Sequence, residues 1–578
     1  MPSVGRPITT PSRNQVAKDV DEWYDQKTVS LRFIAAQENY CLFFSLTMDG
    51  WKNVVAHKPM RAASVHFVTE NGNLVSIPLE VSVIRDKSAN GIRSWFAQAL
   101  RDKGFSERRL ISVTTDMCST EVASINRQNE EGGATEETKE LAQFLAEWNQ
   151  FIQSVGISHN GCKPHKASTS ASTAIKNAGL MAQAKLGRCA CQYVNNHYKV
   201  EMLYTETRDD PQYHVQYVNR AGEEVQGKVQ TLADYSDSRF VGAVLCTKRL
   251  LANRNIWNVI SDEAQKASNV DVPPWKSCPR ISPTDWDRCA DIVTLLDPLT
   301  SFIELHSGRH YPTLNEVIPS LIMLRSRLNL FVFGNSDRGL FLQMQLSDAG
   351  RGSIRTEEGK RLLWELLRTL DGNFEAEFSD PATLAAMFFD PRYRDFRSAY
   401  TNKDVGKWKQ EERDLRGELR REGTRFDLTR KMRDAVMFLY QRLFPQDAES
   451  DRQEVETVDP VRQPLWTELD RWGSKFLDHI GHKYLEPNDM WQDKMVRLEF
   501  PRLVKIQRAV YGITASAVDV ETIWSKMKLV ATRLRANLTA ARAGKQAFVA
   551  LYEQEEERMR NLGDPFPCRE GQHAVEDV

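Results

Sequence analysis

The sequence of 578 residues predicts an α/β core that is followed by a large all-α block and by further helices after an acidic linker. The core is indicated by short β-rich segments between residues 42 and 116, two of which flank an Asn-Gly pair, the strongest short hairpin signal. The all-α block is indicated beyond Ser238, where apolar residues recur at three- and four-residue spacing. A chain of this length is expected to form two or more hydrophobic cores.

The core begins with a helix-compatible pattern over residues 20–40 and a buried strand over residues 42–51. Residues 60–69 and 74–84 follow as two further strands, joined by the turn Glu70-Asn71-Gly72-Asn73. Residues 92–103 form an amphipathic helix that ends at Gly104. Residues 109–116 are again β-rich. A strand that follows a helical crossover commonly pairs parallel to an earlier strand, so we expect this strand beside the first one.

Two of these strands end in an aspartate, Asp49 and Asp116. If the strands lie side by side, the two carboxylates emerge at the same sheet edge. Two negative charges so placed repel each other, and proteins commonly offset this repulsion by binding a divalent cation between the carboxylates. The alternative is that each aspartate opens a turn or caps the next segment, as Asp before Gly often does.

Five helical segments are expected in the all-α block, with Gly, Pro and Asn between them. They cover residues 239–260, 284–306, 314–331, 357–373 and 428–443. Residues 444–464 are acidic and rich in turn-forming residues, which predicts a linker. Helices are then expected over residues 465–480, 490–510 and 515–547. Residues 502–545 hold nine Lys or Arg against Asp519 and Glu521, so this region is a candidate phosphate-binding surface, or else an ordinary solvated helix face.

Composition restricts the class of protein. The formal net charge is -1, so no overall basic field indicates a nucleic-acid partner, and such a site has to come from local clustering. Nine cysteines without a regular framework favour a reducing compartment. The polar first twenty residues do not resemble a signal peptide, and no apolar run is long enough to cross a bilayer. We therefore expect an intracellular protein without a membrane partner.

Zinc is a weaker candidate. Cys162 and His165 form a Cys-x-x-His pair, and Cys189 and Cys191 follow, but the spacing fits no closed finger pattern. Buried, inert cysteines are the favoured interpretation.

A series of motifs supports a resemblance over residues 21–555. In chain order they are SLTMDGW at 45–51, VTTDM at 113–117, ELHSGRHYPTLNEVIP at 304–319, AAMFFDPRYRDF at 385–396, MWQDKMVRLEFPRL at 490–503 and TASAVDVETIWSKMKLVATRLRANLT at 514–539. Together, in this order, they are similar to the motifs of hAT-superfamily transposases.

The resemblance implies an α/β RNase H-like core that is interrupted by a large all-α insertion domain and completed by C-terminal helices. It implies an Asp49, Asp116 and Glu521 triad that holds Mg²⁺ or Mn²⁺ for cleavage and transfer of DNA strands. The implied partners are DNA and a second copy of the chain, bound through the C-terminal dimerisation region, and the implied location is the nucleus. Candidate DNA-binding residues are Arg239, Phe240, Lys526, Lys528, Arg533 and Arg535.

The expected division of the chain combines these patterns with the resemblance. It comprises a flexible N-terminus (1–20), the first part of the core (21–200), an irregular connector (201–237), the helical insertion (238–443), the acidic linker (444–464), the dimerisation region that completes the core (465–555) and a flexible tail (556–578).

The sequence also departs from the family pattern. No zinc-finger spacing precedes Asp49, Gln192 replaces the histidine of the Cys-x-x-His motif, and Phe240 replaces a tryptophan that stacks on a flipped base. These departures favour an alternative, in which the chain is a catalytically inactive, domesticated or truncated transposase derivative that acts through dimerisation and DNA binding.

Overall fold

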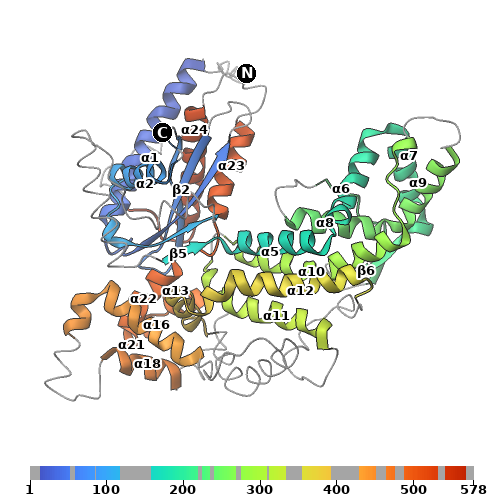
Figure 1. Ribbon diagram of the computed structural model, residues 1–578. Coiled ribbons are helices and arrows are strands. Elements are labelled where there is room, and N and C mark those ends of the chain that lie inside the picture. The colour runs from blue at the N-terminus through green and yellow to red at the C-terminus, as the bar shows by residue number, and fades with distance from the viewer. Residues whose placement is uncertain are drawn as a thin grey trace, which may run out of the picture. The chain divides into compact units, whose positions relative to one another are not determined.

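A computed structural model describes most of the chain. The described residues are 13–52, 59–84, 86, 88–116, 158–218, 224–234, 240–267, 275–308, 311–333, 354–391, 428–450, 464–474, 487–530 and 540–567. They divide into two compact units, a sheet unit and a helical unit. The sheet unit contains Met1–Lys163, His306–Pro319 and Ala376–Val578, and the helical unit contains Pro164–Leu305 and Ser320–Glu375. Most of the described residues are helical, and a small mixed sheet lies in the sheet unit (Figure 1).

The sheet has the strand order β3-β2-β1-β4-β5. Its strands are β1 (Phe44–Lys52), β2 (Pro59–Val68), β3 (Leu74–Val83), β4 (Leu110–Thr115) and β5 (Ser158–Gly161). The pairs β1–β2 and β2–β3 are antiparallel, whereas β1–β4 and β4–β5 are parallel. The first four strands, the hairpin between β2 and β3 and the parallel pairing of β1 with β4 confirm the sequence predictions.

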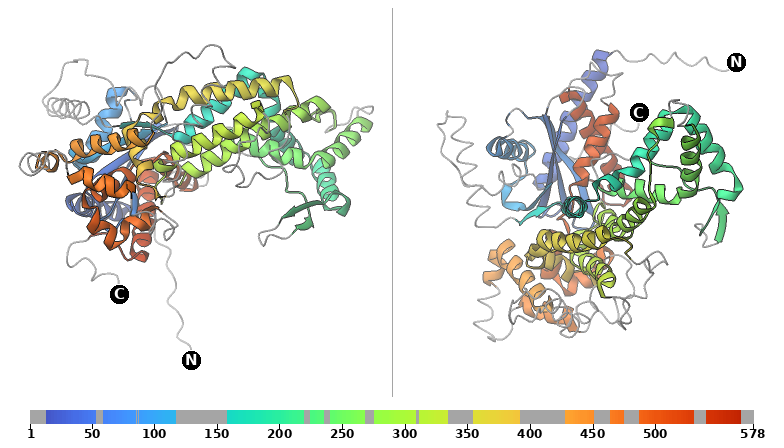
Figure 2. Two further views of the ribbon diagram at one scale, coloured as in Figure 1. Left: turned by 90° about the horizontal axis from the view of Figure 1, so that it is seen from below. Right: turned by 45° about the vertical axis from the view of Figure 1, so that its right-hand side comes forward.

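Alternation along β1 separates the two faces of the sheet. Phe44 contacts the ring of Phe105, which follows helix α2 (Ala89–Asp102). On the other face, Asp49 contacts Trp524 of helix α23 (Val518–Val530). Helix α24 (Ala540–Asn561) packs beside α23, so α2 and the C-terminal helix pair cover opposite faces (Figure 2, right).

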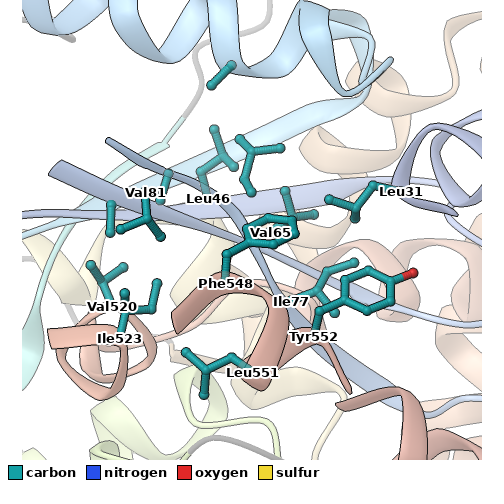
Figure 3. Packing of buried hydrophobic residues seen from close by; sticks show 14 of the residues in the cluster. Leu31, Leu46, Val65, Ile77, Val81, Val520, Ile523, Phe548, Leu551 and Tyr552 are labelled. Atoms are coloured by element: carbon teal, nitrogen blue, oxygen red, sulfur yellow. The ribbon is translucent and has the colours of Figure 1, made fainter. Parts of the chain in front are cut away.

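One hydrophobic core joins the two ends of the chain. Figure 3 shows Phe548 and Tyr552 of α24 against Val65 and Ile77 of the sheet, and all four side chains are buried. Helix α1 (Arg13–Ala36) adds Leu31 and contributes Tyr24, whose ring packs edge-on against Phe548. The helix therefore starts inside the segment expected to be a flexible N-terminus, which corrects that expectation for residues 13–20.

The sheet unit contains further helices among its described residues. Its helices are α13 (Pro381–Phe388), α16 (Leu428–Leu443), α18 (Pro464–Ser474), α20 (Pro487–Gln492), α21 (Lys494–Glu499) and α22 (Pro501–Tyr511), with the short turn η6 (Leu314–Glu316). Residues 445–450 of the expected acidic linker are also helical. The expected flexible tail is wrong for its described part, because α24 continues to Asn561 and Asp564 is 4% exposed.

The helical unit starts much earlier than residue 238. Its helices are α5 (Lys163–Ala178), α6 (Met181–Asn196), α7 (Tyr198–Asp209), α8 (Phe240–Ala252), α9 (Arg254–Ala267), α10 (Pro283–His306), α11 (Val317–Phe333) and α12 (Glu357–Phe374), and β6 (Val215–Val218) pairs with β7 (Glu224–Gly227). The expected boundaries of core, irregular connector and insertion are therefore corrected: the insertion begins at Pro164, and residues 428–443 belong to the sheet unit. Among the described helices, none is long and apolar enough to span a membrane.

The expected helix over residues 239–260 is broken in two at Asn253. The buried side-chain amide of Asn253 donates a hydrogen bond to the carbonyl of Gln230 and accepts one from the hydroxyl of Tyr204. Asn253 also caps α9, since its carbonyl accepts the amide of Trp257. Because Asn253 makes these hydrogen bonds, helix α8 ends before it and helix α9 starts after it.

Candidate metal centre at the ends of strands β1 and β4

The parallel pairing of β1 and β4 brings Asp49 and Asp116 to the same edge of the sheet. Thr47 is the partner of Thr114; Asp49 follows two residues later within β1, and Asp116 directly follows the last residue of β4. The negative charge of Asp116 contributes to a raised pKa of Asp49, as expected for neighbouring carboxylates. The two aspartates therefore lie close enough to interact, but β1 continues past Asp49 to Lys52 and does not end at this residue as expected.

Asp49 is held by two hydrogen bonds. Its Oδ1 accepts the backbone N–H of Gly50 at 2.7 Å, and its Oδ2 accepts the indole N–H of Trp524 at 2.9 Å. Burial is the main cause that raises the pKa of Asp49 to about 6, and the charge of Asp116 acts in the same direction. The two hydrogen bonds and the positive charge of Arg61 oppose this shift because they stabilise the ionised carboxylate.

Arg61 brings its positive charge to this edge from the neighbouring strand. It is the partner of Gly50 in the β1–β2 ladder and is 9% exposed. Its Cζ lies 3.5 Å from the position that a Cβ would take at residue 50. Because consecutive residues of β1 point to opposite faces, the guanidinium lies over Gly50 on the face opposite to the Asp49 side chain and acts on that carboxylate through its charge.

Helix α23 carries the third expected ligand, Glu521. The helix begins after a buried segment, and the carbonyl of Ala517 accepts the amides of Val520 and Glu521. Glu521 lies in the first turn, three residues before Trp524, so the two side chains share one side of the helix. Across the described residues, however, no group of three His, Cys, Asp or Glu side chains is arranged to hold a metal ion. Glu521 is thus on the helix that contacts Asp49 but does not complete such a group.

The segment before α23 is fixed to the sheet by side-chain hydroxyls. Ser45 donates to the carbonyl of Gly512 at 2.6 Å, and Thr114 donates to the carbonyl of Thr514 at 3.0 Å. The amide of Lys163 donates to the carbonyl of Ala515 at 2.8 Å. These bonds satisfy backbone carbonyls that are buried, which positions the first turn of α23 over the strand ends.

A row of buried polar side chains forms a second link between α23 and the sheet. Thr47 Oγ1 lies 2.8 Å from Nε2 of His66, and Nδ1 of the same imidazole lies 3.4 Å from Oδ2 of Asp519. Thr47 and His66 are fully buried and Asp519 is 4% exposed. Sequence reasoning missed the roles of His66, Asp519 and Trp524, and the only signal was polar residues in otherwise apolar strand and helix patterns.

The candidate DNA-binding residues are only partly described. Lys526 lies on α23 and is half-buried, and Lys528 lies on the same helix without a described side chain. Phe240 is the first residue of α8, and its side chain is likewise not described. Arg239, Arg533 and Arg535 lie outside the described residues.

The four Cys and His residues considered as zinc ligands differ in burial. Cys162 and Cys191 are buried, whereas His165 and Cys189 are exposed. Burial raises the pKa of the Cys191 thiol and so favours its neutral form.

The donor atoms of Asp49 and Asp116 suit a divalent cation. Asp49 and Asp116 offer the carboxylate oxygens that Mg²⁺ and Mn²⁺ prefer, and a cation between them would offset the repulsion that raises the pKa of Asp49. Comparison with known proteins adds no assignment, because neither a protein-family model nor a curated protein matches the chain.

Proposed function

We propose that this chain is a hAT-like DNA transposase, or a protein derived from one, whose Asp49 and Asp116 bind a divalent cation at the end of an RNase H-like sheet. The observation that carries the proposal is the register of β1 and β4, which sets the two aspartates level at one sheet edge. The order of three antiparallel strands, a helix and a parallel strand supports the same proposal. A helical insertion between Lys163 and Ala376 is also consistent with it.

On this proposal Asp49 and Asp116 are the first metal ligands and Glu521 is the third. A pair of Mg²⁺ or Mn²⁺ ions, when bound, supplies an activated water or 3′-hydroxyl and stabilises the leaving oxygen at phosphorus. The chain's own contribution is to hold Asp49 through Gly50 and Trp524. DNA as substrate, dimerisation through residues 465–555 and a nuclear location belong to the proposal on the strength of the sequence motifs alone.

Calorimetric titration with Mn²⁺ tests the site without needing the correct DNA. We expect the wild type to bind and Asp116→Ala to lose at least tenfold in affinity, because one of two charged ligands is removed. Asp297→Ala is the matched control, since Asp297 is half-exposed and pairs with Lys248 in the helical unit. A wild type that does not bind, or an Asp116→Ala variant that binds equally well, would contradict the proposal.

Glu521→Ala separates the two forms of the proposal. Loss of Mn²⁺ binding in this variant indicates a complete triad, and nicking of supercoiled DNA that requires Mn²⁺ and Asp116 is then expected. Unchanged binding indicates a two-carboxylate site. That result favours the second candidate, a non-catalytic transposase derivative, which is supported by the lack of a three-ligand group among the described residues and by the charge of Arg61 acting on Asp49.

A further inference from the structure

The contact between Trp524 and Asp49 joins residues that are 475 positions apart in the sequence. The indole N–H donates to Oδ2 at 2.9 Å, while Oδ1 accepts the N–H of Gly50 at 2.7 Å. Both carboxylate oxygens are therefore oriented by one donor each. Because a carboxylate oxygen has two lone pairs, each oxygen still has one lone pair that can face a cation.

The position of the indole is itself fixed. Trp524 is 5% exposed and belongs to the hydrophobic core formed by the sheet with α23 and α24. Its neighbours on α23, Val520, Ile523 and Met527, are buried in the same core. The ring cannot turn away from Asp49 without opening this packing, so the N–H is a fixed donor rather than a mobile surface group.

We propose that Trp524 is a positioning residue that holds the Asp49 carboxylate in the orientation in which it binds a divalent cation. The inference rests on the proposed function, because it assigns a role to Trp524 toward the metal site of Asp49 and Asp116. Hydrogen bonds to ligating carboxylates orient the ligand, and their loss typically weakens metal affinity by about 10- to 100-fold. Trp524 would contribute in this way although it contacts neither the ion nor the substrate.

Trp524→Phe tests the donor, because phenylalanine keeps an aromatic ring in the core and removes only the indole N–H and part of the ring. Trp95→Phe is the matched control: the Trp95 indole donates at 2.7 Å to the hydroxyl of Ser82 and so provides the same kind of bond elsewhere in the sheet unit. We expect Mn²⁺ to bind about tenfold more weakly to Trp524→Phe and with unchanged affinity to Trp95→Phe.

Indole NMR of the unmodified protein shows whether the ion binds beside Trp524. Nε1 of Trp524 lies 2.9 Å from Oδ2, so an ion coordinated by that oxygen at about 2.1 Å is at most about 5 Å from the indole nitrogen. In protein labelled with ¹⁵N at tryptophan, paramagnetic Mn²⁺ is expected to remove the Trp524 signal, which is assigned by its absence from Trp524→Phe. Diamagnetic Mg²⁺ is expected to shift this signal but to leave it visible.

The outcomes distinguish this inference from the proposed function. If the wild type binds no Mn²⁺, both the proposed function and this inference are wrong. A wild type that binds Mn²⁺, with equal affinity in Trp524→Phe, overturns the inference alone. A Trp524 signal that survives saturating Mn²⁺ shows that the ion binds away from Asp49, and it overturns both the proposed function and the inference. Equal losses in Trp524→Phe and Trp95→Phe also overturn it, since they indicate a general loss of packing.

Discussion

The ammonium of Lys163 lies 2.6 Å from Oε2 of Glu377, and the two side chains are 1% and 4% exposed. Lys163 is the last residue of the sheet unit before the chain enters the helical unit, and Glu377 follows directly after the chain returns at Ala376. The pair therefore joins the two sides of the insertion within the sheet unit. Buried charges require such pairing, because transfer of an unpaired charge out of water is costly.

Removing one partner of this pair is expected to destabilise the protein. Lys163→Met removes the ammonium that faces the buried carboxylate of Glu377, for which a loss of about 3–5 kcal/mol in unfolding free energy is expected in urea denaturation. Lys163→Met combined with Glu377→Leu should recover most of that loss, because two apolar side chains replace the pair. Lys266→Met, in an exposed pair with Glu263, is the control and should cause no measurable change. A double variant as unstable as the single one would contradict this account.

The raised pKa of Asp49 predicts a pH-dependent stability in the absence of metal. Because the pKa is about 6 in the folded protein and 3.8 for an ordinary aspartate, the folded protein binds the proton more tightly than the unfolded chain does. Ionised Asp49 therefore lowers stability above pH 6, and this penalty disappears as the pH falls toward 3.8. In EDTA, the difference in unfolding free energy between Asp49→Asn and the wild type should shrink by about 2 kcal/mol between about pH 7.5 and about pH 4.5.

Asp116→Asn offers a control for the cause of that shift. It removes one of the charges that raise the pKa of Asp49, so the pH-dependent difference should become smaller in this background. A difference that is independent of pH in both backgrounds would show that Asp49 titrates near its ordinary value.

Asp564 attaches the C-terminal end of α24 to the hairpin between β2 and β3. Its carboxylate accepts hydrogen bonds from the hydroxyl of Thr69 at 2.6 Å and from the side-chain amides of Asn71 and Asn73 at 2.9 and 2.8 Å. Asp564→Ala removes the acceptor for all three, and we expect a loss of about 2–4 kcal/mol. Hydrogen exchange should accelerate at the amides of the turn, including Gly72. Asn71→Ala, which removes one exposed donor, should cost less than Asp564→Ala, and equal losses would contradict the proposed anchoring.

Gly187 permits a close approach of α6 to α8 in the helical unit. A Cβ at this position would lie 2.4 Å from the backbone carbonyl oxygen of Cys246, which cannot move without the helix. Gly187→Ala should therefore cost about 1–3 kcal/mol in thermal or urea unfolding. Gly372→Ala is the matched control, because nothing lies within 4 Å of its Cβ position on α12. That substitution should stabilise the helix by about 0.5 kcal/mol, since alanine is the better helix former.

Much of the sheet was predictable because its signals are local. The short β-rich runs of β1 to β4 and the Asn-Gly turn define strands within the span of a few residues, and the positive φ of Gly72, 88°, is what such a turn requires. The pairing of β1 with β4 followed from a general preference of crossover connections. Together these rules were sufficient to place Asp49 and Asp116 at one edge.

The parts that could not be predicted depend on contacts between distant segments. Strand β5 has the sequence Ser-His-Asn-Gly, which carries no β-forming pattern, and it exists because β4 offers an edge for pairing. Helix α5 is rich in Ser, Thr and Lys, so its sequence resembles a polar loop. The indole bond of Trp524 to Asp49 has no local signal, since it is created when α23 packs on β1.

The covering of an N-terminal sheet by C-terminal helices also affects the synthesis of the chain. Strand β3 is complete at residue 83, whereas α24, which packs against it, begins at residue 540. At about 5–20 residues per second, the ribosome needs roughly 20–90 s to bridge that interval. During this time the apolar side chains of Val65 and Ile77 lack the partners that bury them in Figure 3. The sheet unit can thus reach its final packing only after α24 has left the ribosome, and until then the nascent sheet exposes apolar surface.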